Sequence, residues 1–515
     1  MRRFALATLL GLACLALPQT KIGNDRAITP DRLRDHLEFI ASDEMEGRDT
    51  PSRGLDTATL YVATQLKLWG AVPAGDNGTF FQNIPLVSKN MDVDASSLSL
   101  SGVTYKFGDG FKGATGSASG SGGLVYAGHG YVLKSKGIDP YAGLDVKGKV
   151  VVVASGRPAG VSFSDLRSDG AESPTEAATK RGALAVVTIP TSGYLESWSA
   201  ASANRLGRLA PEERSGEVAN VTVGRALADA LLAGEPMTVA DAMKGSDAPE
   251  KGFAFSPGKS LTLNVVEHRE VQNTRNVVAI VPGTDPALKS EYVAFGAHID
   301  HLGMRTGGTG DRIYNGADDD GSGTVSILEI AHAYLTGPRP KRSLLFVWHI
   351  GEEKGLWGSA WFNEHPTVDL KKVVTQLNID MIGRSKPAGD TKPANRVLTG
   401  PNEVYVVGSS MMSTDLQRVS ESVNKGFLNL SFNYKYDDPK DTERIFFRSD
   451  HYNYAHKGIP IIFYFDGVHE DYHRPSDEVS KIDFEKMSRV ARTVYATGWT
   501  IANGKRPIVD KPLKE

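Results

Sequence analysis

The chain has 515 residues, which is more than one ordinary domain requires and suggests two or three. Hydrophobic residues make up 40% of it and charged residues 23%, a composition typical of globular proteins. The 58 basic and 61 acidic residues nearly cancel, and no long run of one sign occurs, so neither nucleic acid nor an anionic membrane is favoured as a partner.

The first 20 residues have the organisation of a signal peptide. Arg2 and Arg3 precede an uncharged, largely apolar run from Phe4 to Pro18, which is too short for a good bilayer span. We therefore expect export to the periplasm or the extracellular space and no integral membrane span. The only cysteine, Cys14, follows Gly-Leu-Ala in an imperfect lipoprotein pattern, so lipid anchoring through Cys14 is the alternative to ordinary cleavage. After ordinary cleavage, any metal ion must be held by histidine, aspartate and glutamate.

Two helices are predicted next. Residues 29–41 carry apolar side chains at Leu33, Leu37 and Ile40, which is helical spacing, and residues 56–69 repeat the pattern.

The middle of the chain has a different composition. Residues 108–123 are rich in glycine and serine and are typical of a linker or loop. Residues 175–181 predict a short helix, and apolar runs predict strands at 123–127, 149–153 and 183–189. We expect a separate mixed domain here.

From residue 271 onward, predicted strands alternate with predicted helices. The strands are 271–280, 292–297, 343–349, 373–381 and 459–465. The helices are 323–335, 413–424 and 484–502. This alternation predicts an α/β domain with a sheet covered by helices on both faces.

Residue types that bind metals follow several of these strands. They are His298, Asp300, Glu352, Glu353, Asp380 and His473. In addition, the stretch NGADDDGSG at 315–323 places three aspartates before a helix. Open α/β sheets build their sites at the carboxyl ends of strands. We infer a pair of divalent ions, one held by His298 and one of the three aspartates, the other by Glu353 and His473, with Asp380 as a further carboxylate. Of the two adjacent glutamates, one can ligate while the other takes a proton from water.

One apparent motif is rejected. Residues 469–473 match the zinc-protease pattern HExxH, which requires a helix to place both histidines on one face. Pro475 disfavours a helix through this segment. We therefore keep only His473 as a ligand and expect His469 to be an ordinary loop histidine.

Six stretches together resemble a known family. They are AHIDHLG, NGADDDGSG, GEEKGLWGS, NIDMIGR, FRSDHYNYAHKGIP and DYHRPSDE, in this order within residues 271–500. The segment is similar to the family 28 metallopeptidases of clan MH, which include bacterial leucyl aminopeptidases. The resemblance implies the zinc exopeptidase fold, a mixed sheet sandwiched by helices.

The middle segment resembles a protease-associated domain through LDVKGKVVVV and AATKRGALAVV. In such enzymes this smaller β-rich α+β domain is inserted into the peptidase domain. The expected organisation is a signal peptide at 1–20, peptidase segments at 21–108 and 263–505, the inserted domain at 109–262 and a tail at 506–515.

The resemblance also implies the site residues. Two zinc ions would be held by His298, Asp318, Glu353, Asp380 and His473, with Asp318 bridging them. Glu352 would be the general base, and Asp300 would orient the ring of His298.

The other two aspartates of the triplet have turn-forming or structural roles in this interpretation. Asp319 would shape a tight turn, and its counterpart in the family follows a cis peptide bond. Asp320 would be structural, near the start of the following helix, where a carboxylate interacts favourably with the helix dipole.

The implied function is that of an exported dizinc aminopeptidase acting on peptides with a free N-terminus. A glutaminyl cyclase is one alternative on the same scaffold. A glutamate carboxypeptidase-like enzyme is another, for which Arg305, Arg384 or Arg448 could bind the substrate carboxylate. A non-catalytic binding protein is disfavoured by the intact ligand set. Asp450 and His451 either form hydrogen bonds near the cleft or only hold their loop.

Overall fold

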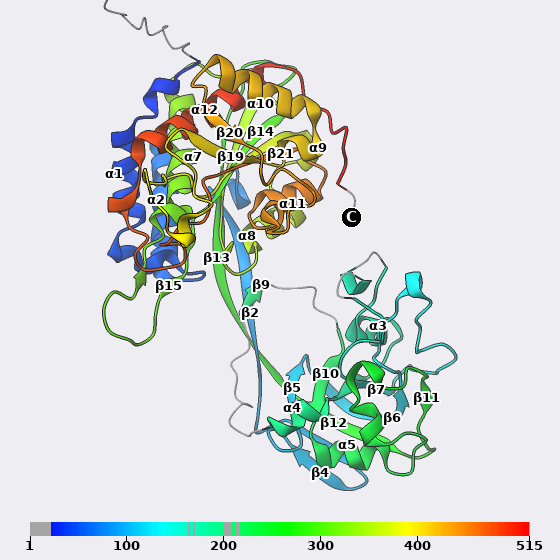
Figure 1. The fold of residues 1–515 in the computed structure, drawn as a ribbon. Helices are drawn as coiled ribbons and strands as arrows, with labels where there is room; N and C mark the ends of the chain where they lie inside the picture. The colour runs from blue at the N-terminus through cyan, green and yellow to red at the C-terminus, as the bar shows by residue number, and fades with distance from the viewer. Residues whose placement is uncertain (1–21, 163–164, 168–169, 199–208, 212–216, 514–515) are drawn as a thin grey trace, which may run out of the picture. The chain divides into compact units, whose positions relative to one another are not determined.

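The computed structural model divides the chain into two compact units (Figure 1). The described residues are 22–162, 165–167, 170–198, 209–211 and 217–513. One unit comprises the chain up to Ile84 together with Asn273–Glu515, and the other is Pro85–Gln272. The expected signal peptide, including Cys14, lies outside the described residues. Among the helices described, none has the length and apolar character needed to cross a membrane.

The first unit is built on a mixed sheet. Its strands are β1 (Val72–Pro73), β2 (Phe81–Met91), β13 (Glu267–Val281), β14 (Tyr292–His298), β17 (Ser343–His349), β18 (Val373–Ile379), β19 (Glu403–Val407), β20 (Ser431–Asn433) and β21 (Ile461–Phe465), with a separate pair β15 (Gly303–Met304) and β16 (Ile313–Tyr314). They run in the order β20-β19-β21-β18-β14-β17-β13-β2, and β1 pairs with β13. The pairs β17–β14, β14–β18 and β18–β21 are parallel, whereas β13 and β19 run antiparallel to β17 and β21.

Helices cover both faces of this sheet, as predicted. They are α1 (Pro30–Ile40), α2 (Arg53–Leu68), α7 (Gly323–Thr336), α8 (Trp357–Glu364), α9 (Ser409–Met412), α10 (Thr414–Gly426), α11 (His451–His456) and α12 (Phe484–Asn503). α1, α2, α10 and α12 pack with α7 or with one another on one side, whereas α8 and α11 pack together on the other, against β17, β18 and β21 (Figure 1). All residues of β17 and β18 are therefore buried.

Local chemistry explains where α1 begins. The Thr29 side chain accepts the backbone N–H of Arg32, and Pro30 occupies the first turn, where its missing N–H costs nothing. Leu33, Leu37 and Ile40 are buried, as the spacing predicts.

The parallel strands bring their carboxyl ends to one edge. His298 at the end of β14 lies in register with His349 at the end of β17. Asp380 follows the last residue of β18, beside them. The expected shared edge is thereby present.

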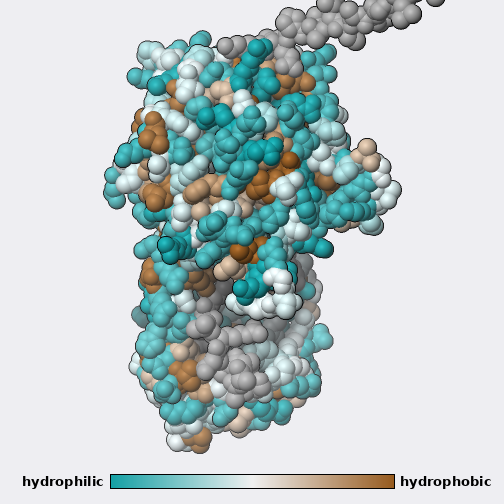
Figure 2. All heavy atoms as spheres, turned by 90° about the vertical axis from the view of Figure 1, so that its left-hand side faces the viewer, coloured by the Kyte–Doolittle hydropathy of each residue, from teal (hydrophilic) through white to brown (hydrophobic). Residues whose placement is uncertain are grey.

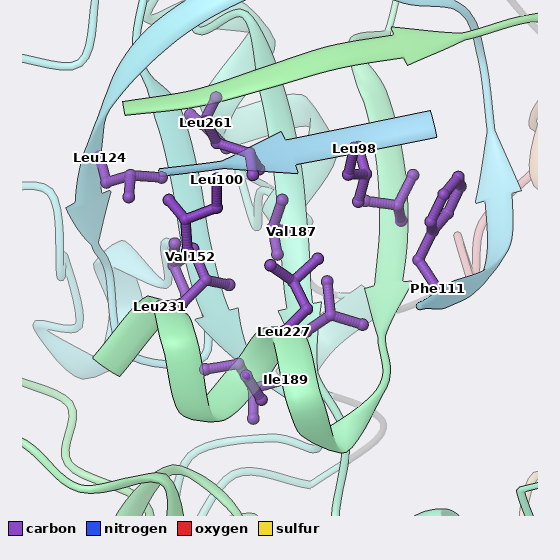
Figure 3. Close-up of a cluster of buried hydrophobic side chains, with 14 of the residues drawn as sticks. Leu98, Leu100, Phe111, Leu124, Val152, Val187, Ile189, Leu227, Leu231 and Leu261 are labelled. Atoms are coloured by element: carbon purple, nitrogen blue, oxygen red, sulfur yellow. The ribbon is translucent and has the colours of Figure 1, made fainter. Parts of the chain in front are cut away.

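The second unit is rich in strands. They are β3 (Ser97–Leu100), β4 (Val103–Lys106), β5 (Phe111–Thr115), β6 (Ala118–Tyr126), β7 (Val150–Ala154), β8 (Ala185–Ile189), β9 (Ala210–Pro211), β10 (Ala219–Val223), β11 (Phe253–Ala254) and β12 (Ser260–Val265). Its helices are α3 (Pro174–Lys180), α4 (Ser192–Glu196), α5 (Arg225–Leu232) and α6 (Val239–Ala242). Figure 3 shows Leu227 and Leu231 of α5 packed against leucines and valines of the strands.

Two expectations for this unit differ from the structure. Residues 108–123 do not form a linker, because they contain β5 and most of β6. The unit also starts at Pro85 and ends at Gln272, outside the expected limits 109–262. The early strand β3 pairs with β12, more than a hundred residues later, and this long-range pairing is invisible to local composition. Its identity as a protease-associated domain stays a prediction.

The outer face of α1 and α2 is mixed in polarity. Figure 2 shows scattered hydrophobic side chains among hydrophilic ones on this side. Phe39, Leu60 and Leu68 are the large exposed hydrophobic residues of these two helices. Scattered exposure of this kind is ordinary for a protein surface.

Candidate metal centre

His298 is fixed by residues that follow it. Its Nδ1 lies 3.0 Å from the backbone oxygen of Asp300 and 3.6 Å from the Oδ1 of that residue. A carbonyl oxygen can only accept, so Nδ1 donates this bond and Nε2 is the nitrogen that faces the carboxylates of the site. The Asp300 carboxylate also accepts the backbone N–H of Glu352 at 3.2 Å, which connects the ends of β14 and β17.

The Asp319 carboxylate lies in the middle of the site. Its Oδ1 is 3.2 Å from Nε2 of His298, and its Oδ2 is 3.2 Å from Nε2 of His473. One carboxylate thus faces histidines from two distant parts of the chain.

Asp318 does not occupy the bridging position that the resemblance implies. Its Oδ1 accepts the backbone N–H of Gly383 at 2.6 Å, and its Oδ2 is 3.1 Å from Nε2 of His469. Asp319, not Asp318, points into the site, so this assignment is corrected. The reason is local: the backbone of Asp319 leaves the helical region (φ −99°, ψ 99°), and neighbouring side chains then diverge.

Asp320 is structural and caps α7, as expected. Its Oδ1 accepts the N–H groups of Gly323 and Met381, at 2.8 and 3.1 Å, and its Oδ2 accepts that of His298 at 3.2 Å. The same buried carboxylate therefore holds the start of α7 and the segments that carry His298 and Asp380. The peptide bond between Asp319 and Asp320 is cis.

The other carboxylates complete two groups. Asp380 Oδ1 and Glu352 Oε2 lie 3.7 and 3.9 Å from Nε2 of His298. Glu353 Oε2 lies 3.1 Å from Nε2 of His473, and its Oε1 lies 2.7 Å from Nδ1 of His301. The structure thus brings together every site residue expected from the sequence except Asp318, and adds Asp319 and His301.

Several of these buried atoms have no hydrogen-bond partner among the described residues. They are Nε2 of His298, Nδ1 of His301, Oδ2 of Asp319 and Oε1 of Glu353. Buried polar atoms are nearly always satisfied, so a cluster of exceptions indicates a place where a ligand can bind. Ligand atoms of His298, Asp319 and Asp380 lie within 4.8 Å of one another, as do those of His301, Asp319 and Glu353. Imidazole nitrogens and carboxylate oxygens are a donor set that fits zinc.

The pKa shifts of the site residues also indicate that a cation can bind here. Burial raises the pKa of Glu352 well above its ordinary value, and the nearby Asp380 and Glu353 raise it further, against the lowering effect of His298. Burial opposes the charged form of His473, but Asp319 and Glu353 raise the pKa of its imidazole to about 10. Without a cation, the carboxylates are balanced by protons on histidine, and a bound cation would displace those protons.

Arg48 holds the backbone around the site in place, and it was not identified from the sequence. Its guanidinium is fully buried and donates to the carbonyl oxygens of Ile299, Asn315 and Gly316 at 2.7–3.0 Å and to that of Ile40 at 2.7 Å. Burial lowers its pKa to about 10. Arg48 ties the end of α1 to the segment just before the three aspartates and to the residue after His298.

A pocket opens beside the carboxylates. It is lined by Asp319, Glu352, Asp380, Met381, Ile445, Arg448, Phe463, Phe465, Val468 and Tyr472. Of the three arginines considered for substrate binding, only Arg448 lines it. Arg384 is buried in a pair with Asp471 at 2.9 Å, and Arg305 is exposed and donates to Tyr314.

The loop histidine His469 has a defined role. Residues 469–473 are not helical, which confirms that HExxH is not a zinc motif here. His469 is nevertheless 3% exposed and contacts Asp318 and Arg384. It is a buried structural histidine rather than an ordinary loop residue.

Asp450 and His451 both lie in the interior. Asp450 is 3.4 Å from Nδ1 of His349, and the ring of His451 donates from Nε2 to the backbone oxygen of Phe446 at 2.8 Å. Burial lowers the pKa of His451 to about 4. Asp450 and His451 therefore contact buried neighbours, and neither is among the residues that line the pocket.

Comparisons with known proteins identify a family and several relatives that this chain resembles. Residues 276–498 match the model of peptidase family M28. A probable leucine aminopeptidase of Arthroderma benhamiae is 29% identical over 250 residues, covering 47% of this chain and 60% of that protein. The chain thus spans about 60% of the length of the curated relatives it matches. Among solved structures, an aminopeptidase from Aneurinibacillus sp. strain AM-1 aligns with a TM-score of 0.45 at 18% identity, over 95% and 97% of the two chains.

Proposed function

The chain carries a peptidase family M28 domain at residues 276–498, and we propose that it is an exported dizinc aminopeptidase. It would remove residues one at a time from peptides with a free N-terminus. Export rests on the signal-peptide pattern of residues 1–20.

One observation carries the proposal. The carboxylate of Asp319 lies between two groups of ligand atoms, several of which are buried and have no partner within the described part of the chain. A shared carboxylate between two such groups is the arrangement that a pair of metal ions requires.

The protein residues fit two zinc ions. His298 and Asp380 would hold one, Glu353 and His473 the other, and Asp319 would serve both. Zinc ligands lie about 2.0–2.2 Å from the ion, so atoms on a tetrahedron around it are about 3.4 Å apart. The separations of 3.1, 3.2 and 3.7 Å between these side chains are close to that value. When bound, the two ions would supply Lewis acidity to the scissile carbonyl and to the attacking water.

Glu352 is proposed as the general base. It lines the pocket, lies beside His298 and is not needed to complete either ligand group. From this position it would take a proton from water and pass it to the leaving amine.

The pocket wall favours an apolar side chain at the substrate N-terminus. Ile445, Phe463, Phe465 and Val468 supply hydrophobic surface to the pocket that the carboxylates also line. Such a wall would accept a leucine-like side chain, while the surrounding acids favour a positively charged α-amine.

Arg448 favours a second candidate, a carboxypeptidase. Its guanidinium lines the same pocket and donates to the Tyr472 hydroxyl at 3.3 Å, a position from which it could also bind a substrate carboxylate.

One assay tests whether the enzyme is an aminopeptidase. Leucyl p-nitroanilide and its N-acetylated form are offered to the enzyme with and without a chelator. An aminopeptidase releases nitroaniline only from the free amine, and chelation abolishes the release. Cleavage of the blocked form alone would exclude the aminopeptidase. A glutaminyl cyclase would instead close N-terminal glutamine without releasing a residue.

A further inference from the structure

We propose that His301 is an additional ligand of the second metal position, the one formed by Glu353 and His473. The inference rests on the proposed function, because it concerns the same pair of ions. It makes the two metal positions unequal. The first position is formed by His298, Asp319 and Asp380. The second is formed by His301, Asp319, Glu353 and His473.

The position of the His301 ring supports this role. Its Nδ1 lies 2.7 Å from Oε1 of Glu353 and 3.8 Å from Oδ2 of Asp319. Nε2 of His473 lies 3.1 and 3.2 Å from the same two carboxylates. The two histidine rings approach in a T-shaped arrangement with centroids 5.8 Å apart. Both imidazoles therefore lie beside the same two carboxylates, those of Asp319 and Glu353.

An ordinary hydrogen bond does not account for His301. The residue is fully buried, and both of its ring nitrogens lack a hydrogen-bond partner among the described residues. Oε1 of Glu353 also lacks one, although it is close to Nδ1 of the ring. The two atoms are near each other but not aligned as donor and acceptor. Atoms arranged in this way can share a cation that lies to one side of the line between them.

The surrounding backbone fixes the ring. The N–H of His301 donates to the carbonyl of Arg48 at 3.2 Å. Gly316 has a φ of +55°, and a Cβ atom there would lie 2.6 Å from carbons of the imidazole. Any side chain at this position would push the ring out of place, so the chain keeps room for His301 just before the three aspartates.

Unequal donor sets predict unequal affinities. Two imidazoles and two carboxylates provide four protein ligands for the second ion, which is the usual number for zinc in a closed site. The first ion has three and leaves a position for substrate or water. The second ion should therefore bind more tightly and be the last to leave during chelation.

The test uses the full chain stripped of metal and the variant His301→Ala. Zinc affinity is measured by competition with a chromophoric chelator, and cobalt is bound as a spectroscopic probe of the ligands. His301→Gln, which preserves more of the volume, replaces His301→Ala if the latter does not fold. His129→Ala, which alters a buried histidine of the other unit, is the matched control.

We expect the parent chain and the control to bind two zinc ions. His301→Ala should weaken the tighter ion more than tenfold and change the visible absorption of cobalt at that position. Affinity within tenfold of the parent, or an unchanged cobalt spectrum, would overturn the role of His301 and leave the proposed function standing. If the parent chain binds no zinc, the proposed function fails as well.

Discussion

Asp318 and Asp319 are consecutive in the chain, yet their carboxylates face different parts of the molecule. Asp319 lies between His298 and His473, whereas Asp318 accepts the N–H of Gly383. Only one of the two can join two metal ions, and the local backbone decides which.

We therefore expect Asp319→Asn and Asp318→Asn to behave differently. Asparagine at 319 removes the shared negative charge and should weaken zinc binding at both positions by more than about 100-fold. Asparagine at 318 alters a residue that only supports the ligands, and such changes typically cost about 10–100-fold. Zinc content after dialysis and kcat/KM on leucyl p-nitroanilide measure the difference. A larger loss from Asp318→Asn would contradict the assignment.

Glu352→Gln tests the general base. The substitution keeps the size of the side chain but removes proton transfer, so kcat should fall by about 10²–10⁴-fold. Zinc content should stay at the parent value, because Glu352 completes neither ligand group. Glu364→Gln, the same change at an exposed position of α8, should leave both quantities unchanged. Loss of zinc from Glu352→Gln would mean that this residue, and not Glu353, is the ligand.

The elements that the sequence predicts correctly are those determined by nearby residues. The spacing of Leu33, Leu37 and Ile40 predicts α1, and the apolar run 343–349 predicts β17 with its bounds. The shared edge of the sheet then follows from parallel pairing, so His298, Glu353 and Asp380 could be placed near one another from the sequence.

The other features of the candidate site depend on geometry that the spacing of residues along the chain does not encode. Which of three consecutive aspartates faces the ions depends on the backbone angles of Asp319. A single extra histidine such as His301 has no distinguishing pattern. Arg48 is a buried cation held by four carbonyl groups, and arginine is usually exposed.

Arg48→Lys should destabilise the first unit, which contains the candidate metal centre. Lysine cannot reproduce the planar fork that reaches the carbonyls of Ile40, Ile299, Asn315 and Gly316, so buried acceptors would be left without donors. We expect a loss of at least about 2 kcal/mol in the free energy of unfolding, measured by urea denaturation. Arg418→Lys, at an exposed position of α10, should change it by less than about 0.5 kcal/mol. Equal effects would show that the buried hydrogen bonds of Arg48 contribute little.

His451 should make stability depend on pH. Burial lowers its pKa to about 4 in the folded chain, whereas an unfolded histidine titrates near about 6.5. Between these values the unfolded chain binds a proton that the folded chain does not. The contribution of neutral His451 is therefore present above about pH 6.5 and lost as the pH falls toward 4.

The comparison of parent and His451→Gln isolates this effect. Between pH 7 and pH 5, the parent should lose about 2 kcal/mol more of its free energy of unfolding than the variant. His456→Gln, at an exposed position of the same helix, should follow the parent. Parallel pH profiles for the parent and His451→Gln would show that His451 is not held neutral.

A reconstitution titration tests most directly whether two metal ions act together at one site. Zinc is added in known amounts to the metal-free chain, and the rate of leucyl p-nitroanilide hydrolysis is followed. We expect no activity without zinc and a plateau at two equivalents per chain. Full activity at one equivalent, or activity that persists in the metal-free chain, would contradict a site in which two metal ions act together.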